Sequence, residues 1–160
     1  GVMPKGYKHV TIENNTFINC GAYPVWLQGK EQCETAVVRN NLIAYIDHEA
    51  QVEKYDWTPA ESGVRIDYEG PKDFCDYNLF FGCKNREYGE NDFVAEPQFV
   101  DPENGDYRLK PGSPGVDAGM TIPAVKTDLR GVKRPQGKAY DIGAYELKQP
   151  EKSAAGAQKE

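Results

Sequence analysis

The sequence lacks the long apolar run that a membrane-spanning helix needs, since no stretch approaches 20 apolar residues. Its mean hydropathy is -0.71, and the first residues, GVMPKGYKHV, contain no apolar core of a signal peptide. P-loop, GxGxxG, HExxH and paired CxxC motifs are also missing. The sequence therefore predicts none of the nucleotide or zinc sites that these motifs mark.

Positive charge is scarce as well. The formal net charge of the 160 residues is -6, whereas nucleic-acid-binding proteins usually carry a basic stripe. No nucleic-acid partner is therefore predicted. The negative net charge argues weakly against a polyanionic substrate, although a chain of negative net charge can still contain one basic groove. The length is enough for one domain with a real hydrophobic core.

A pattern of about ten residues occurs three times, and it organises the chain. The copies are 10–20 (VTIENNTFINC), 36–46 (AVVRNNLIAYI) and 74–83 (FCDYNLFFGC). They align on Asn15, Asn41 and Asn78, which are 26 and 37 residues apart, so an insertion of about one loop lies in the second copy. Internal repeats of this length indicate stacked supersecondary units.

The repeated positions predict two apolar columns beside the asparagines. Ile12, Val38 and Cys75 stand three residues before the anchors, and Phe17, Ile43 and Phe80 stand two residues after them. Alternating apolar residues fit short strands with one buried face. Asparagine tolerates the left-handed backbone of a sharp bend. We therefore expect the three asparagines to stack at one bend, with their amides hydrogen-bonded along the stack.

This pattern resembles the right-handed parallel β-helix of the pectate-lyase-like superfamily, with its asparagine ladder. The resemblance implies an all-β fold with about three coils at 1–92 and a C-terminal tail packed on the coils at 93–147. The polar, low-complexity end of the chain predicts a disordered segment at 148–160. An ordinary β-sandwich with asparagine turns is the alternative. Because the sequence starts almost inside a coil, we expect upstream coils or another chain to cover the N-terminal end, unless 1–9 forms a cap.

The segments 96–119 and 127–146 contain the motifs DAG at 117–119 and DIGAYE at 141–146. On these motifs they resemble the C-terminal ending of many secreted bacterial β-helix proteins, including polysaccharide lyases and glycosidases. The resemblance implies a secreted, periplasmic or cell-surface location. Within the tail, one strand is expected at 107–109. Asp128, Arg134 and Asp141 are expected to pin the tail through ion pairs and turn hydrogen bonds while Tyr145 packs.

The four cysteines are expected to be mostly free thiols. Cys20 and Cys83 occupy the same repeat position two coils apart, which strand spacing puts about 9.6 Å apart, and a disulfide needs Cα atoms closer than about 7 Å. Cys75 belongs to an inward column, where a free thiol behaves as a small apolar group. Cys33 lies in a polar loop without an evident partner. The cysteines therefore do not fix the compartment.

Two further strands, near 25–28 and 63–69, are predicted to form the surface that is richest in polar, charged and aromatic side chains. Alternate residues in both are apolar and point inward, so Arg65 is predicted to stack over Trp26, and Asp67 over Gln28. The insertion 47–61 is expected to lie beside these two strands and to form the wall of a groove. The inward residues are Val25, Leu27, Val64 and Ile66. The outward residues, which we call the candidate groove, are Trp26, Gln28, Arg65, Asp67, Tyr68 and Glu69.

The candidate groove suits carbohydrate chemistry. Trp26, Trp57 and Tyr68 can offer aromatic platforms to sugar C–H faces. Hydrolysis needs two carboxyl groups about 5–5.5 Å apart for retention or about 6.5–9.5 Å apart for inversion, and Asp67 with Glu49 or Asp47 is the candidate pair. A lyase instead needs a base and a cation that neutralises a uronate carboxylate, for which Arg65 with His48, Lys54 or Tyr68 is suited.

Each of these residues also has a plain structural interpretation. Arg65 and Asp67 can form a surface ion pair worth under about 1 kcal/mol, His48 can be solvated, and Trp26 can pack under the insertion. Asp47, His48 and Glu49 are consecutive and do not converge on one metal ion. No cofactor is predicted, and no motif supports Ca²⁺.

The functional prediction is a carbohydrate-active β-helix enzyme acting on polysaccharide or oligosaccharide, of which this chain is the C-terminal part. The acidic charge and the carboxyl-rich insertion favour a glycoside hydrolase slightly over a polysaccharide lyase. The alternative is a non-catalytic carbohydrate-binding or structural segment whose active site lies in upstream coils.

Overall fold

The computed structural model describes Val2 and residues 8–20, 23–27, 34–45, 63–66, 74–83 and 89–150. These residues form short strands, irregular loops and a 3₁₀ helix, η2 (Pro102–Asn104). The described chain is thus essentially all-β, as the sequence predicts. Among the described residues there is no helix with the length and apolar character to span a bilayer.

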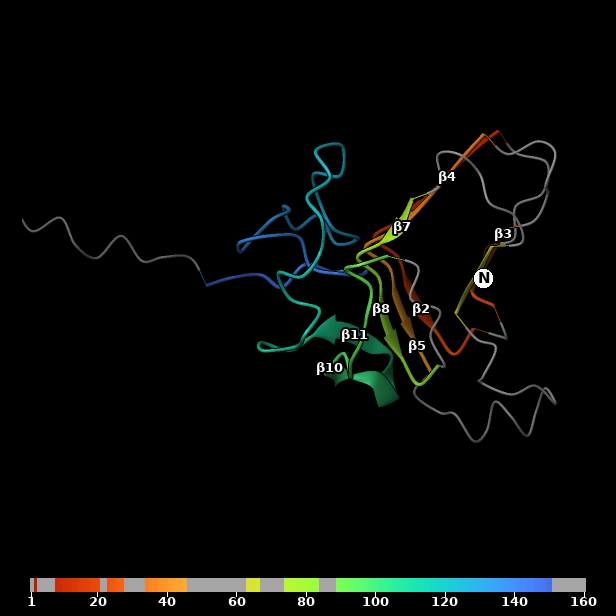
Figure 1. The fold of residues 1–160 in the computed structure, drawn as a ribbon. Helices are drawn as coiled ribbons and strands as arrows, with labels where there is room; N and C mark the ends of the chain where they lie inside the picture. The colour runs from red at the N-terminus through yellow and green to blue at the C-terminus, as the bar shows by residue number, and fades with distance from the viewer. Residues whose placement is uncertain are drawn as a thin grey trace, which may run out of the picture.

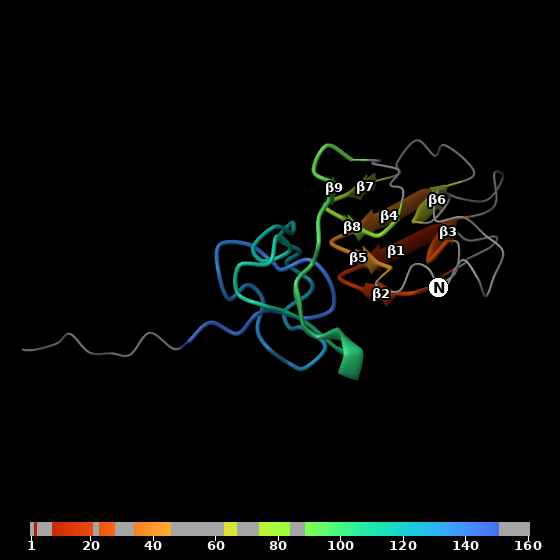
Figure 2. The same ribbon diagram turned by 90° about the horizontal axis from the view of Figure 1, so that it is seen from below.

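Three parallel sheets contain the repeats (Figure 1). The first sheet has the order β1 (His9–Glu13), β4 (Thr35–Arg39), β7 (Phe74–Asp76). The second has the order β2 (Thr16–Ile18), β5 (Leu42–Ala44), β8 (Leu79–Phe81), β9 (Phe93–Val94). The third pairs β3 (Val25–Leu27) with β6 (Val64–Ile66). Figure 2 shows β1 beside β4 and β5 beside β8, so each repeat adds one strand to each of the first two sheets.

The register confirms both predicted apolar columns. Val38 pairs with Ile12 on one side and Cys75 on the other, and Ile43 lies between Phe17 and Phe80 in the same way. The inward residues of all three sheets form one core. The members of that core with no exposed surface are Val25, Leu27, Val38, Ile43 and Phe80.

The asparagine stack is also confirmed. The side-chain amide of Asn15 donates to Oδ1 of Asn41 at 3.1 Å, and that of Asn41 donates to Oδ1 of Asn78 at 3.1 Å. The left-handed backbone, however, lies one residue before each anchor, at Asn14, Asn40 and Tyr77, where φ is 55°, 54° and 57°. The anchors themselves do not have a left-handed backbone, and their side-chain amides form the hydrogen bonds of the stack.

Parallel pairing extends beyond the predicted coil region of 1–92. Phe93 pairs with Leu79 and Val94 with Phe80, so β9 adds a strand to the second sheet. Asp92, just before β9, takes the place of a ladder asparagine and accepts hydrogen bonds from Asn78. The first residues of the predicted tail therefore continue the stack.

The rest of the tail covers the outer face of the second sheet. The antiparallel strands β10 (Phe99–Asp101) and β11 (Asp106–Leu109) include the strand expected at 107–109. Phe99, Leu109 and Ile142 share a second core with residues of the sheet, Leu42, Ala44 and Leu79. The sheet is therefore buried on both faces along β5, where every residue is buried.

Direct hydrogen bonds fix the tail to the repeats. Asn40 Nδ2 donates to Met120 O at 2.7 Å, and Met120 N donates to Asn40 Oδ1 at 2.8 Å. Near the end of the tail, Ala144 N donates to Thr16 Oγ1 at 2.9 Å. These contacts join positions up to 128 residues apart.

The tail is held internally by buried charges, as the sequence predicts. The guanidinium of Arg134 pairs with Glu146 at 2.9 Å and donates to the carbonyls of Asp141 and Gly143. Asp128 accepts two turn hydrogen bonds on Oδ1 and the N–H of Glu146 on Oδ2. The ion-pair partner, Glu146, is one that the prediction did not name.

The described cysteines are free thiols. Cys20 and Cys75 are half-buried and Cys83 is buried, and none of the three forms a disulfide. Burial, together with the charges of Asp92 and Asp76, raises the pKa of the Cys75 thiol far above its usual range. The thiol of Cys75 therefore stays protonated and acts as a core group. Cys33 lies outside the described residues.

Candidate functional site

The described part of the candidate groove is a cluster of one guanidinium and two aromatic rings on β3 and β6. Trp26 and Arg65 are paired in register on these parallel strands. Tyr23 lies just before β3. We call Tyr23, Trp26 and Arg65 the β3–β6 cluster. The predicted stacking of Arg65 over Trp26 is confirmed.

Burial alternates beneath the cluster and explains why these side chains project outward. Val25 and Leu27 are fully buried, and Val64 is 2% exposed. In a strand, neighbouring residues point to opposite faces. Trp26 and Arg65, which are half-buried, therefore stand on the outer face of the third sheet.

The geometry within the cluster is close. Cζ of Arg65 lies 5.0 Å from the ring centroid of Trp26 and 5.0 Å from that of Tyr23. Nη1 of Arg65 donates to the Tyr23 hydroxyl at 3.2 Å. The two rings are 5.5 Å apart with an angle of 52° between their planes. A cation over an aromatic face contributes about 0.5–1 kcal/mol at an exposed position, so these contacts hold the guanidinium in place.

Sequence reasoning missed Tyr23. The segment 21–24 reads as a turn between two strands, and the repeat pattern does not say how that turn approaches β6. The approach brings the Tyr23 hydroxyl within 3.2 Å of Arg65. An aromatic residue three positions before an outward tryptophan is the one signal that the sequence offers.

Most of the other predicted site residues lie outside the described residues. They are Gln28, Asp47, His48, Glu49, Lys54, Trp57, Asp67, Tyr68 and Glu69, together with the rest of the wall at 47–61. The structure therefore brings together Trp26 and Arg65 and leaves the proposed carboxyl pair and the lyase base as predictions.

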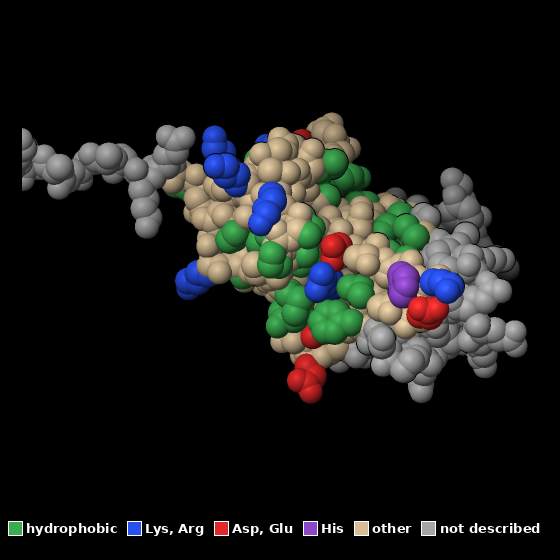
Figure 3. Space-filling view, turned by 90° about the horizontal axis from the view of Figure 1, so that it is seen from above, with side chains coloured by type: hydrophobic (Ala, Val, Ile, Leu, Met, Phe, Trp, Pro, Cys, Tyr) green, Lys and Arg blue, Asp and Glu red, His purple; other side chains and the backbone are tan. Residues whose placement is uncertain are grey.

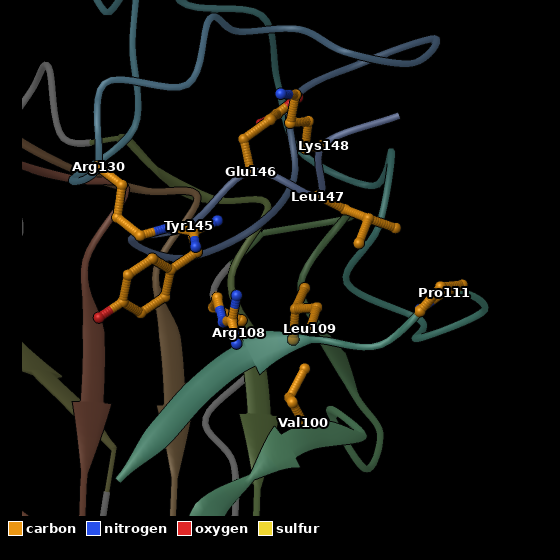
Figure 4. Close-up of a pocket in the computed structure, with 9 residues that line it drawn as sticks. All are labelled: Val100, Arg108, Leu109, Pro111, Arg130, Tyr145, Glu146, Leu147 and Lys148. Atoms are coloured by element: carbon orange, nitrogen blue, oxygen red, sulfur yellow. The ribbon is translucent and has the colours of Figure 1, made fainter. Parts of the chain in front are cut away.

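A concave feature lies on the tail and is lined by none of the residues of the β3–β6 cluster. This hollow of about 240 Å³ is lined by Arg108, Leu109, Arg130, Tyr145 and Lys148, among others. Figure 4 shows Arg130 and Tyr145 on one side of it and Pro111 on the other. We call it the tail hollow.

Charged and metal-ligating side chains are dispersed elsewhere in the described chain. On the face shown in Figure 3, Lys and Arg side chains are scattered rather than gathered in a stripe. Within the described ranges, no three His, Cys, Asp or Glu side chains are grouped so that they could hold a metal ion.

Comparison of the chain with known protein families, with curated proteins and with solved structures finds no match.

Proposed function

We propose that this chain is part of a right-handed parallel β-helix protein that acts on or binds carbohydrate, and that the β3–β6 cluster belongs to its saccharide-binding face. Support for the architecture comes from the pairing of each strand with its counterpart one repeat later. Parallel crossover connections are right-handed in about 98% of cases, which favours a right-handed coil. The asparagine ladder agrees with the resemblance to pectate-lyase-like proteins.

The observation that carries the functional proposal is the in-register pair of Trp26 and Arg65. The indole ring offers a flat apolar surface to the C–H face of a sugar ring. The guanidinium presents several N–H donors in a fixed plane, which suits hydroxyl or carboxylate oxygens. Because both side chains stand on strands, their spacing is held more rigidly than on a loop.

Within this proposal, a glycoside hydrolase is slightly favoured over a polysaccharide lyase. Asp67 comes two residues after Arg65 and, with Glu49 or Asp47, is the candidate pair of acid and base or nucleophile. In a lyase, Arg65 would neutralise the carboxylate of a uronate while His48, Lys54 or Tyr68 removed the neighbouring proton. The substrate in either case is a polysaccharide or oligosaccharide, and a secreted or cell-surface location follows from the resemblance.

One observation favours the non-catalytic alternative. A guanidinium stays protonated at all physiological pH values, so Arg65 cannot carry protons in catalysis. Arg65 is also held by the Tyr23 hydroxyl and two ring faces. The described part of the face is thus suited to binding, and catalysis depends on the predicted carboxylates.

The test uses the full chain and a panel of neutral and uronate oligosaccharides. Asp67→Asn should keep the fold but lower turnover at least about 10²-fold, the low end for acid–base catalysis. Trp26→Ala should mainly weaken binding, because it removes a platform and no proton carrier. Leu129→Ala is the control, since Leu129 is 72% exposed on the tail.

Saccharide binding without turnover would assign the chain to the non-catalytic alternative. Full binding and full activity in both Trp26→Ala and Arg65→Ala would show that the β3–β6 cluster is only surface. A protein that neither binds nor cleaves any member of the panel would contradict the proposal.

A further inference from the structure

We propose that the tail hollow binds an anionic group of an acidic glycan, a uronate carboxylate or a sulfate ester. This inference rests on the proposed carbohydrate function and assigns a second binding site outside the β3–β6 cluster. The hollow lies where β11 passes the end of the tail, between residues 108–111 and 145–148 (Figure 4).

Three of the nine residues that line the tail hollow are cations. Arg108, Arg130 and Lys148 all contribute to it. Arg108 is paired with Asp106 through two hydrogen bonds, Nε to Oδ1 at 2.7 Å and Nη2 to Oδ2. Within the described part of the chain, the side chains of Arg130 and Lys148 form no ion pair. Two positive charges are therefore left to attract a ligand.

The acidic residue in the lining does not cancel this charge. The side chain of Glu146 is fully buried and pairs with Arg134 at 2.9 Å. Its two oxygens also accept hydrogen bonds from the backbone N–H groups of Gln136 and Asp141. The carboxylate is thus already satisfied inside the tail, and its charge is balanced there by a buried guanidinium.

The remaining lining is apolar and fits the body of a sugar ring. Leu109, Pro111 and Leu147 form one side of the tail hollow, and the Tyr145 ring forms the other, with Cζ of Arg130 5.8 Å from the ring centroid. Pockets for drug-sized ligands measure about 300–1,000 Å³. The hollow of about 240 Å³ is smaller and suits one sugar residue.

The position of the hollow also fits the charge of the chain. A protein with a formal net charge of -6 repels a polyanion over most of its surface. An acidic glycan therefore binds best where the local charge is reversed. Arg130 and Lys148, which form no ion pair with any described residue, provide such a place beside the Tyr145 ring. The Asp106 pair holds the third cation, Arg108, at the edge of the same hollow.

The experiment is calorimetric titration of the full chain with four probes: a tri-galacturonate, a sulfated disaccharide, a neutral cello-oligosaccharide and sodium sulfate. The first two separate carboxylate from sulfate ester. We expect at least one of them to bind at least about tenfold more tightly than the neutral sugar, with affinity falling as salt rises. The double variant Arg130→Gln/Lys148→Gln should weaken that binding at least about tenfold.

Lys138→Gln is the matched control, because Lys138 is exposed and does not line the hollow. Trp26→Ala separates the two proposals, since it should leave binding at the hollow unchanged and affect only the β3–β6 cluster. Equal binding of neutral and acidic sugars, unchanged acidic-sugar binding in the double variant, or no binding of any acidic probe at millimolar concentration would each overturn the inference. Sulfate binding as tightly as the acidic sugars would indicate an adventitious ion only and would overturn it too.

Discussion

Asn78 donates two hydrogen bonds to one oxygen of Asp92, from its side-chain amide at 3.0 Å and from its backbone N–H at 2.7 Å. Asn41 and Asn78 each accept from the asparagine before them in the ladder, and each also donates to a backbone carbonyl, Asn41 to Ile12 and Asn78 to Val38. An aspartate carboxylate only accepts. Asp92 therefore ends the ladder without needing an acceptor of its own.

This arrangement predicts that Asp92→Ala is more damaging than Asp92→Asn. Among the described residues, alanine removes the acceptor of three hydrogen bonds, two from Asn78 and one from the backbone N–H of Gly89. Asparagine keeps one acceptor oxygen for Asn78 and, of these three hydrogen bonds, loses the one from Gly89. Urea denaturation of the full chain should show a loss of at least about 2 kcal/mol for alanine and clearly less for asparagine. Equal losses would contradict the role of Asp92 as the end of the ladder.

Asn41→Ala should be among the most destabilising single changes in the ladder. The side chain of Asn41 is fully buried, and its amide donates to Ile12 O at 2.9 Å while its oxygen accepts from Asn15. Each buried group that loses its partner costs about 1–3 kcal/mol, so we expect a total loss of about 2–4 kcal/mol in the free energy of unfolding. The control is Asn104→Ala, because Asn104 is exposed and its side chain donates a hydrogen bond to Asp101, the residue just before η2.

The ladder and the columns could be predicted because their signal is local and repeated. A period of two gives the inward residues, and the aligned asparagines give the register between repeats. The same alternation predicted that Arg65 would stand over Trp26. In each case a short stretch of sequence contains the whole reason for the contact.

The sequence does not predict where the ladder ends, because the signal there is too short. Asp92 lies 14 residues after Asn78, whereas the earlier anchors are 26 and 37 residues apart, and only Phe93 and Val94 follow it as a strand. Two apolar residues are too few to show a period. The attachment of the tail through Asn40 and Met120, 80 residues apart, depends on the folded arrangement alone.

Gly82→Ala should be far more destabilising than Gly105→Ala. Both glycines have a left-handed backbone, with φ of 66° and 77°, so alanine is strained by about 1–2 kcal/mol at either position. At Gly82 an added Cβ would lie 2.2 Å from the carbonyl oxygen of Tyr45, whereas at Gly105 nothing lies within 4 Å. The backbone of the second sheet has to move to accept the first change. We therefore expect a loss for Gly82→Ala that exceeds that for Gly105→Ala by about 2 kcal/mol or more in urea denaturation, and equal losses would contradict the close packing of this bend.

The buried carboxyls of the tail predict a pH dependence of stability. Burial raises the pKa of Glu146 and of Asp141 above the ordinary range, although backbone N–H groups and Arg134 favour the charged forms. In the unfolded chain these groups titrate near pH 4, so above that pH the folded chain holds protons that the unfolded chain has released. Their contribution to stability is complete below the unfolded pKa and declines as pH rises through the folded pKa.

Glu146→Gln tests this dependence. The variant removes one of the two titrations, so its free energy of unfolding should decline less, or rise more, from pH 4 upward than that of the parent chain. The difference in slope can reach about 1.4 kcal/mol per pH unit for one group. The variant should also be less stable at neutral pH by about 3–5 kcal/mol, because Arg134 keeps its charge in a buried place without its partner. Urea denaturation at half-unit steps from pH 4 to 7 measures both effects, and Glu103→Gln, at an exposed residue of η2, is the control. Parallel stability curves for Glu146→Gln and the parent chain would show that folding does not change the pKa of Glu146.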